Sequence, residues 1–162
     1  MSNVLPNSIF GNSLYTLLAP VGDFDARERA AAALGGYQVS INTQSEQDFI
    51  FTKYGNSTEE IYLGTTDRVS EGIWRNSDGT RADFTYWQPG EPNNWNNEDY
   101  AVMITRPQFN PWEPGWSRGK WLDAGNGSWT NFEITNDGKY KTIALAEIPL
   151  SLSITRTGIV KE

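Results

Sequence analysis

One segment of the sequence places acidic and amide side chains close together around a proline. Glu91 and Asn93 flank Pro92, and a second carboxylate, Glu98, follows within the same stretch. A peptide bond before proline adopts the cis form at modest free-energy cost, and a cis bond turns the two flanking side chains to the same side. We therefore expect these carboxylate and amide oxygens to converge, although the residues alone also fit a plain Pro/Asn turn. Oxygen ligands of this kind suit a hard cation such as calcium.

The composition excludes several other chemistries. The 162 residues contain no cysteine and no histidine, which removes disulfides, thiolate nucleophiles and the commonest zinc ligands and general bases. The formal net charge is −7 and no cluster of Lys or Arg is present, so we expect no nucleic-acid partner. No stretch reaches the roughly 18 to 20 apolar residues that span a bilayer, so we expect no membrane insertion.

The first helix is predicted just after a turn at Pro20 and Gly22. Asp23 or Asp25 can cap it, and Asp25 with Glu28 matches a reciprocal capping box. The alanines of 30–33 favour the helix, and the glycines at 35 and 36 provide a left-handed stop.

A shorter helix is predicted after a second capping pair, Thr43 and Glu46. Apart from these helices, the sequence predicts short strands at residues 13–18, 37–41, 61–64, 72–75, 84–87, 100–104 and 142–148. Between 88 and 127 only 100–104 is strand-like, so two long loops flank it. Loops of this length are usually functional or disordered, and their tryptophans favour order. This pattern predicts an α+β domain.

The residues resemble C-type lectins in five blocks that follow the family's order. The blocks are Gly35 to Asn42 with Ser45 to Ile50, Tyr62 to Asp67, Glu71 to Trp74, Ser77 to Gly79, and Glu91-Pro92-Asn93 with Asn97-Glu98-Asp99. The resemblance implies the C-type lectin-like fold, in which two helices pack on small antiparallel sheets with long calcium-binding loops. Tyr100 and Ala146 stand where the family commonly has half-cystines, so the chain is similar to cysteine-free members of bacterial or phage type.

The resemblance also implies a calcium ion that binds a sugar directly. Glu91, Asn93 and Glu98 are implied to hold this calcium, whose remaining valences accept two vicinal sugar hydroxyls. The order Glu then Asn, as opposed to Gln then Asp, resembles members that bind mannose, glucose or fucose. A second, structural calcium is implied at a set that the family forms from two loops: Asp67, Glu71, Asn94 and Asp99.

One further ligand of the sugar-binding calcium is less clear in this sequence. The family provides an Asn-Asp pair after a tryptophan, whereas here Trp121 is followed by Leu122 and Asp123, and Trp129 by Thr130 and Asn131. Asn136-Asp137 is a third candidate without the tryptophan. We favour Asn131, because its separation from Glu147 fits the family better.

The resemblance implies a calcium-dependent carbohydrate-binding domain, not an enzyme, that acts as an adhesion or recognition module of a larger extracellular or cell-surface protein. We expect an N-terminal extension over 1–12, the domain over 13–149 and a tail or linker over 150–162. No apolar signal core follows Met1, so an export signal is absent or removed.

Two other functions stay open at this point. An interaction domain of the same fold would bind a protein or another surface, with calcium structural or absent, and Leu122 in place of a ligand favours it. A glycosidase would use Glu91 and Glu98 as acid and base, which the lack of His and Cys disfavours.

Overall fold

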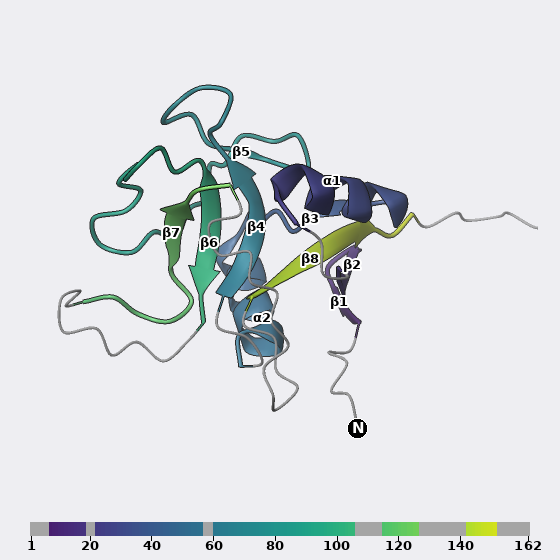
Figure 1. The fold of residues 1–162 in the computed structure, drawn as a ribbon. Helices are drawn as coiled ribbons and strands as arrows, with labels where there is room; N and C mark the ends of the chain where they lie inside the picture. Colours follow the sequence, from purple (N-terminus) through teal and green to yellow (C-terminus); the bar gives the residue numbers. More distant parts are fainter. Residues whose placement is uncertain (1–6, 19–21, 57–59, 106–114, 127–141, 152–162) are drawn as a thin grey trace, which may run out of the picture.

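The structure is a computed structural model that describes residues 7–18, 22–56, 60–105, 115–126 and 142–151 (Figure 1). The described residues form two helices, α1 (Phe24–Ala33) and α2 (Gln44–Tyr54). Their strands are β1 (Ser8–Phe10), β2 (Ser13–Leu17), β3 (Tyr37–Gln38), β4 (Glu60–Thr66), β5 (Arg75–Asn76), β6 (Tyr100–Ile104), β7 (Trp121–Ala124) and β8 (Thr142–Pro149). Neither helix is long and apolar enough to cross a membrane.

The strands form a sheet with the order β1-β2-β8-β4-β6-β7, while β3 adds to β8 and β5 to β4. Figure 1 shows β8, the last strand, between the β1–β2 pair on one side and β4, β6 and β7 on the other. The β4–β8 pair is parallel and the others are antiparallel. The α+β class is therefore confirmed, with a mixed sheet.

The two helices cover opposite faces of the sheet. Successive strand residues point to opposite faces, and along β4 and β6 the residues Ile61 and Met103 belong to one apolar cluster, which also contains Ile50 of α2. Their neighbours Tyr62 and Val102 belong to a second cluster, which contains Ala31 of α1. Burial on both faces explains why β4 and β6 read as continuous apolar runs and not as alternating ones.

Both helices begin at the expected places, but their capping contacts differ from the sequence prediction. Asp23, not Asp25, caps α1 and accepts the Ala26 N–H at 2.9 Å. The predicted Asp25–Glu28 capping box is wrong, because Glu28 accepts the Gln38 side-chain amide at 2.7 Å instead. Thr43 caps α2 as predicted. Its partner Glu46 accepts the N–H of Asn42 at 2.9 Å, one residue before the expected position.

The strands predicted at 72–75 and 84–87 are largely absent, and only β5 forms in this region. The reason is that the tryptophan side chains in this region pack into the hydrophobic core while their backbone stays in loops. The rings of Trp74 and Trp87 lie 4.7 Å apart, and Trp87 also contacts Trp121 edge-on at 5.6 Å. Two short strands were missed, β7 and β1, and β1 lies within residues 1–12 and pairs with β2.

Two buried carboxylates outside the acidic loops lie next to Tyr15 of β2. Glu46 and Glu147 are each 6% exposed. Glu46 accepts the Tyr15 hydroxyl at 2.6 Å, while Glu147 accepts the Ser13 hydroxyl at 2.9 Å and the Ser40 N–H at 3.3 Å. Burial raises the pKa of Glu147, and the nearby charge of Glu46 raises it further.

We predict that Glu147→Gln flattens the pH dependence of stability. Because the folded pKa of Glu147 is raised, the folded state binds more protons than the unfolded state above the ordinary glutamate pKa. Stability therefore falls as the pH rises through the raised pKa, with a limiting slope of about 1.4 kcal/mol per pH unit for one proton. Urea unfolding of both proteins in chelator from pH 4 to pH 8 measures the difference.

The matched control is Asp83→Asn, because the Asp83 side chain is 84% exposed. This control should leave the slope unchanged. Parallel pH curves for Glu147→Gln and the parent protein would contradict the assigned role of Glu147.

Candidate metal centre

The loop between Trp87 and β6 positions three of the predicted ligands, Glu91, Asn93 and Glu98. The Glu91–Pro92 bond is cis, as expected. Asn94, Asn96 and Asn97 have φ angles of 51°, 57° and 65°, a left-handed conformation that asparagine tolerates better than most non-glycine residues. The asparagine-rich sequence is thus what lets the chain turn tightly here.

Hydrogen bonds inside this loop bring Glu91 and Asn93 together. The Asn93 side-chain amide donates to Glu91 Oε1 at 2.8 Å, and the Trp95 N–H donates to Asn93 Oδ1 at 2.8 Å. The Glu98 N–H donates to Asn94 Oδ1 at 2.9 Å, which brings the end of the loop back toward its start. The two side chains are therefore in contact, but the Asn93 amide nitrogen faces Glu91 while its oxygen accepts the Trp95 N–H, so the expected convergence of oxygens stays a prediction.

Asp123 reaches this loop from β7. Its side chain is buried, with Oδ1 accepting the Asn93 N–H at 3.0 Å and Oδ2 accepting the Asn94 N–H at 2.6 Å. Burial and the adjacent Asp123 carboxyl raise the pKa of Glu91 to about 8. Burial and the charge of Asp123 also raise the pKa of Glu98. The carboxyl groups of Glu91, Glu98 and Asp123 therefore lie within electrostatic range of one another.

The position of Asp123 changes the choice of the remaining ligand. Asn131, which the sequence favoured, lies outside the described residues, as do Asn136 and Asp137. Asp123 was given less weight because Leu122 precedes it. Residues alternate along β7, however, so Leu122 packs in the cluster beneath α1 while Asp123 faces the acidic loop.

A second acidic group forms where β4 ends. Asp67 is 2% exposed, its Oδ2 accepts the Gly72 N–H at 2.8 Å, and its own N–H donates to the Asp99 carbonyl at 3.2 Å. Burial raises the pKa of Asp67, and the charges of Glu71 and Asp99 add to the effect. Three of the four residues predicted for the structural calcium are thus neighbours, while the side-chain oxygen of the fourth, Asn94, accepts the Glu98 N–H.

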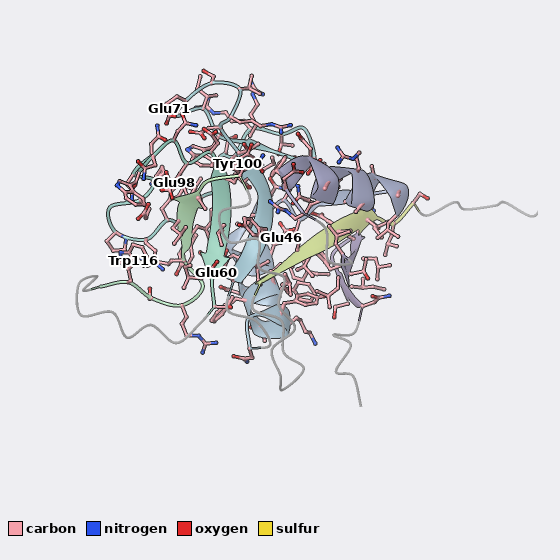
Figure 2. The ribbon with its side chains drawn as sticks, in the orientation of Figure 1. Glu46, Glu60, Glu71, Glu98, Tyr100 and Trp116 are labelled. Atoms are coloured by element: carbon pink, nitrogen blue, oxygen red, sulfur yellow. The ribbon has the colours of Figure 1, made fainter. Side chains whose placement is uncertain are left out.

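These acidic loops gather at one end of the sheet. Figure 2 shows Glu71 and Glu98 there, near Tyr100 at the start of β6 and away from Glu46 and Glu60. This is also the end at which β7 places Asp123 beside Asn93.

Unpaired oxygens test whether these residues fit a cation. Among the described residues, three buried side-chain polar atoms have no hydrogen-bond partner: Asp67 Oδ1, Glu91 Oε2 and Arg27 Nη2. Two of them are carboxylate oxygens of predicted ligands, one from each acidic group. Burial without a partner disfavours the ionised form of these carboxyl groups, in line with the raised pKa values of Asp67 and Glu91, and a divalent cation would stabilise the ionised form.

No set of three or more Asp, Glu, His or Cys side chains in the described ranges is arranged to hold a metal ion by itself. A calcium ion here would therefore need a mixed shell of carboxylate, amide and backbone oxygens, which is the kind of shell that calcium accepts. With that composition the residues fit calcium.

The sequence matches the family model of the lectin C-type domain over residues 24–132. This chain belongs to the C-type lectin domain family. It is 42% identical over 65 residues to human C-type lectin domain family 17, member A. The aligned stretch covers 40% of this chain and 17% of that protein. It is 30% identical over 116 residues to mouse C-type mannose receptor 2. This alignment covers 71% of this chain and 7% of the receptor. The chain thus spans a minor part of these relatives.

Solved structures show the same fold. One is the C-type carbohydrate-recognition domain of cow CD23, solved in the presence of the oligosaccharide GlcNAc2Man3. Its TM-score is 0.68 at 23% sequence identity, and the superposition covers 90% of this chain and 94% of the CD23 chain. A calcium-independent type II antifreeze protein has a TM-score of 0.64 at 17% identity, with coverages of 88% and 91%. The fold-class prediction is confirmed by these neighbours.

We predict that Asp123→Ala loosens the start of the acidic loop in chelator. The substitution removes the acceptor of the Asn93 and Asn94 N–H groups. Hydrogen bonds to a charged acceptor contribute about 1.5 to 3 kcal/mol, so exchange of these two amides should accelerate about 10- to 100-fold. Residue-resolved hydrogen exchange measures this, with Asp83→Ala as an exposed carboxylate control. Unchanged protection of both amides would show that Asp123 does not hold the loop.

Proposed function

We propose that this domain binds a carbohydrate through calcium held by Glu91, Asn93 and Glu98, with Asp123 completing the acidic group. The observation that carries the proposal is the unpaired, buried Oε2 of Glu91 beside Asn93 and Asp123. Family membership supports it, as do the mannose receptor among the relatives and the oligosaccharide present with the cow CD23 domain.

In this proposal the same side chains coordinate calcium and form hydrogen bonds with the sugar. When bound, calcium supplies coordination of two vicinal sugar hydroxyls. The carboxylates of Glu91 and Glu98 accept hydrogen bonds from those hydroxyls, and the amide of Asn93 donates one. Asp123 holds the backbone of Asn93 and Asn94, which fixes the direction of both the ligand oxygens and the donors.

The preferred sugar class follows from the order of carboxylate and amide around Pro92. Glu91 precedes and Asn93 follows the proline, and this order supports mannose, glucose or fucose in preference to galactose. Asn131 stays a proposed additional ligand from the sequence.

We also propose a second, structural calcium at Asp67, Glu71 and Asp99, with Asn94 as a fourth ligand once it exchanges its contact with Glu98. Its support is the buried, unpaired Oδ1 of Asp67, together with the burial and the nearby charges of Glu71 and Asp99 that raise the Asp67 pKa. A cation at this point would neutralise the carboxylates and hold the two loops together.

The wider role that we propose is that of a non-enzymatic adhesion or recognition module of a larger extracellular or cell-surface protein. The absence of cysteines supports placing it with bacterial or phage-type members of the family.

A second candidate function is an interaction domain that binds a protein or another surface. Leu122 favours it, because the residue that stands at the family's asparagine position is packed in the core and offers no ligand. The calcium-independent antifreeze protein shows that this fold also exists without calcium dependence. Sugar binding that survives chelation, or protein binding without sugar competition, would favour this candidate.

We predict that calcium raises the melting temperature and that chelator reverses the effect. A ligand that binds only the folded state at 100 times its Kd stabilises it by about 2.7 kcal/mol, which for a domain of this size corresponds to a shift of about 5 to 10 °C. Scanning calorimetry from micromolar to millimolar calcium measures the shift. Magnesium at equal concentration is the control, because it demands a stricter geometry. A melting curve that ignores calcium would contradict both metal sites.

We further predict that Glu91→Gln combined with Asn93→Asp moves sugar preference toward galactose. The double substitution leaves the net charge unchanged and exchanges the positions of carboxylate and amide. Glycan-array binding with and without calcium measures preference, and the single variant Glu91→Gln is the control that removes a charge without restoring one. Loss of all sugar binding with no change in preference would count against the proposed sugar class.

A further inference from the structure

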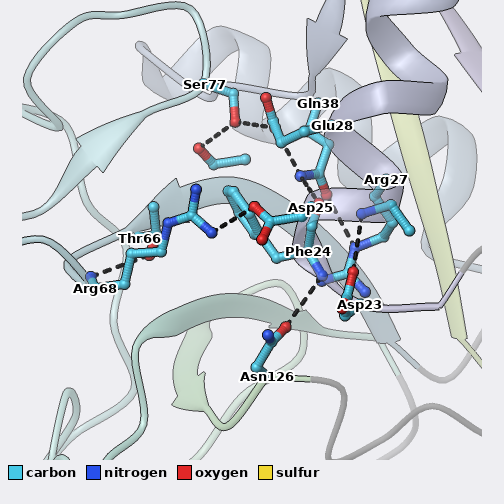
Figure 3. Close-up of polar contacts among 12 residues, drawn as sticks. Asp23, Phe24, Asp25, Arg27, Glu28, Gln38, Thr66, Arg68, Ser77 and Asn126 are labelled. Atoms are coloured by element: carbon cyan, nitrogen blue, oxygen red, sulfur yellow. Dashed lines mark hydrogen bonds and ion pairs between the residues drawn. The ribbon is translucent and has the colours of Figure 1, made fainter.

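The start of α1 meets the acidic loops through a small junction that we define as Phe24, Asp25, Arg68, Tyr100 and Asn126. Figure 3 shows the polar part of it, with Arg68 directed toward Asp25 and Asn126 toward the backbone of Phe24. Arg68 Nη1 lies 2.6 Å from Asp25 Oδ1. The Phe24 N–H donates to Asn126 Oδ1 at 3.1 Å. The junction thus links α1 to two separate segments of chain.

The ring of Phe24 is the apolar centre of this junction. Phe24 and Tyr100 are 3% and 5% exposed, and their ring centroids lie 5.0 Å apart. The Arg68 guanidinium carbon lies 4.9 Å from the Phe24 centroid, within the range of a cation–π contact. Arg68 is therefore fixed in two ways, by an ion pair and by a ring face.

Two residues of the junction directly follow proposed calcium ligands. Arg68 follows Asp67, and Tyr100 follows Asp99. The two ligands are themselves joined by the hydrogen bond from the Asp67 N–H to the Asp99 carbonyl. Fixing Arg68 and Tyr100 on one ring therefore fixes the backbone from which both carboxylates extend.

We propose that Arg68, held by Asp25 and Phe24, is a positioning residue for calcium at the Asp67–Asp99 site. The inference rests on the proposed structural calcium. Bringing several carboxylates together without a cation is unfavourable because they repel one another. A side chain that holds the loop backbone in place reduces the ordering that calcium itself must accomplish on binding. Tyr100 stands at a position where the family commonly has a half-cystine, so here packing takes the place of a covalent tie.

The charge of Arg68 makes the proposal sharply testable. Arg68 is a cation next to Asp67, so its removal should raise calcium affinity if only charge mattered. Its removal should lower calcium affinity if position matters more. The two effects have opposite signs, and the direction of the change decides between them.

The experiment is calorimetric calcium titration of the whole chain carrying Arg68→Gln. We expect the affinity of the structural site to fall about 10-fold, within the range seen when outer partners of metal ligands are removed. Glu91→Gln, made in parallel, identifies which binding step belongs to the sugar-binding calcium. The matched control is Arg81→Gln, since Arg81 forms the exposed ion pair with Asp83 at 3.5 Å. It removes the same charge away from the acidic loops.

Two further measurements separate positioning from general stability. The melting temperature in chelator should fall only slightly more for Arg68→Gln than for Arg81→Gln. The Arg68–Asp25 side chains are 37% and 50% exposed, so their ion pair contributes little, and the small extra loss comes from the cation–π contact with Phe24. Arg68→Lys keeps the charge but loses the flat guanidinium, so calcium affinity should fall to an intermediate value. This variant also provides the test if Arg68→Gln does not fold.

An affinity that rises in Arg68→Gln, or that matches the Arg81→Gln control, overturns the positioning role while leaving the calcium site standing. A parent protein with no calcium step beyond the one that Glu91→Gln removes overturns the structural calcium itself. The two failures are therefore distinguishable.

Discussion

The structure depends on one electrostatic constraint. Several carboxylates share one end of the sheet, and within the described part of the chain none of them forms an ion pair with a basic side chain. Burial and the charge of Asp123 raise the pKa values of Glu91 and Glu98, and burial with the charges of Glu71 and Asp99 raises that of Asp67. Backbone N–H groups offset part of this cost by donating to Asp123 and Asp67. One carboxylate oxygen in each group has no hydrogen-bond partner, Glu91 Oε2 in the first and Asp67 Oδ1 in the second. A divalent cation would stabilise the fold most by binding these two oxygens.

Holding such loops without disulfides requires other contacts, and the chain provides them from the core. The ring of Trp87 contacts those of Trp74 and Trp121 and attaches the long loop to the face covered by α2. On the other side, Phe24 brings α1 against Tyr100 and Arg68. Both halves of the acidic region are therefore anchored by aromatic rings, which bury large areas and have defined packing geometry.

The fold class was predictable, because capping residues and apolar runs are local signals. Of the acidic groups, the Glu-Pro-Asn order indicated the first, while the second was implied only by the family resemblance. Asp123 was harder to choose, because its role depends on the face to which β7 points, and Leu122 made the motif look broken. The strands expected around Trp74 and Trp87 were wrong since aromatic residues favour strands in general, whereas here tertiary packing keeps them in loops. Asn131 lies outside the described residues, so its assignment stays a prediction.

The central place of β8 has a consequence for how the protein is made. This strand pairs with β2 on one side and with β4 on the other, and it follows every other described strand in the sequence. During synthesis, the pairings of β8 with β2 and with β4 therefore cannot form until residues 142–149 leave the ribosome. Such distant pairings slow folding, because a long loop must close before they form. A nascent chain shorter than this holds two unfinished halves with unpaired edges, a state in which association with other chains competes with completion.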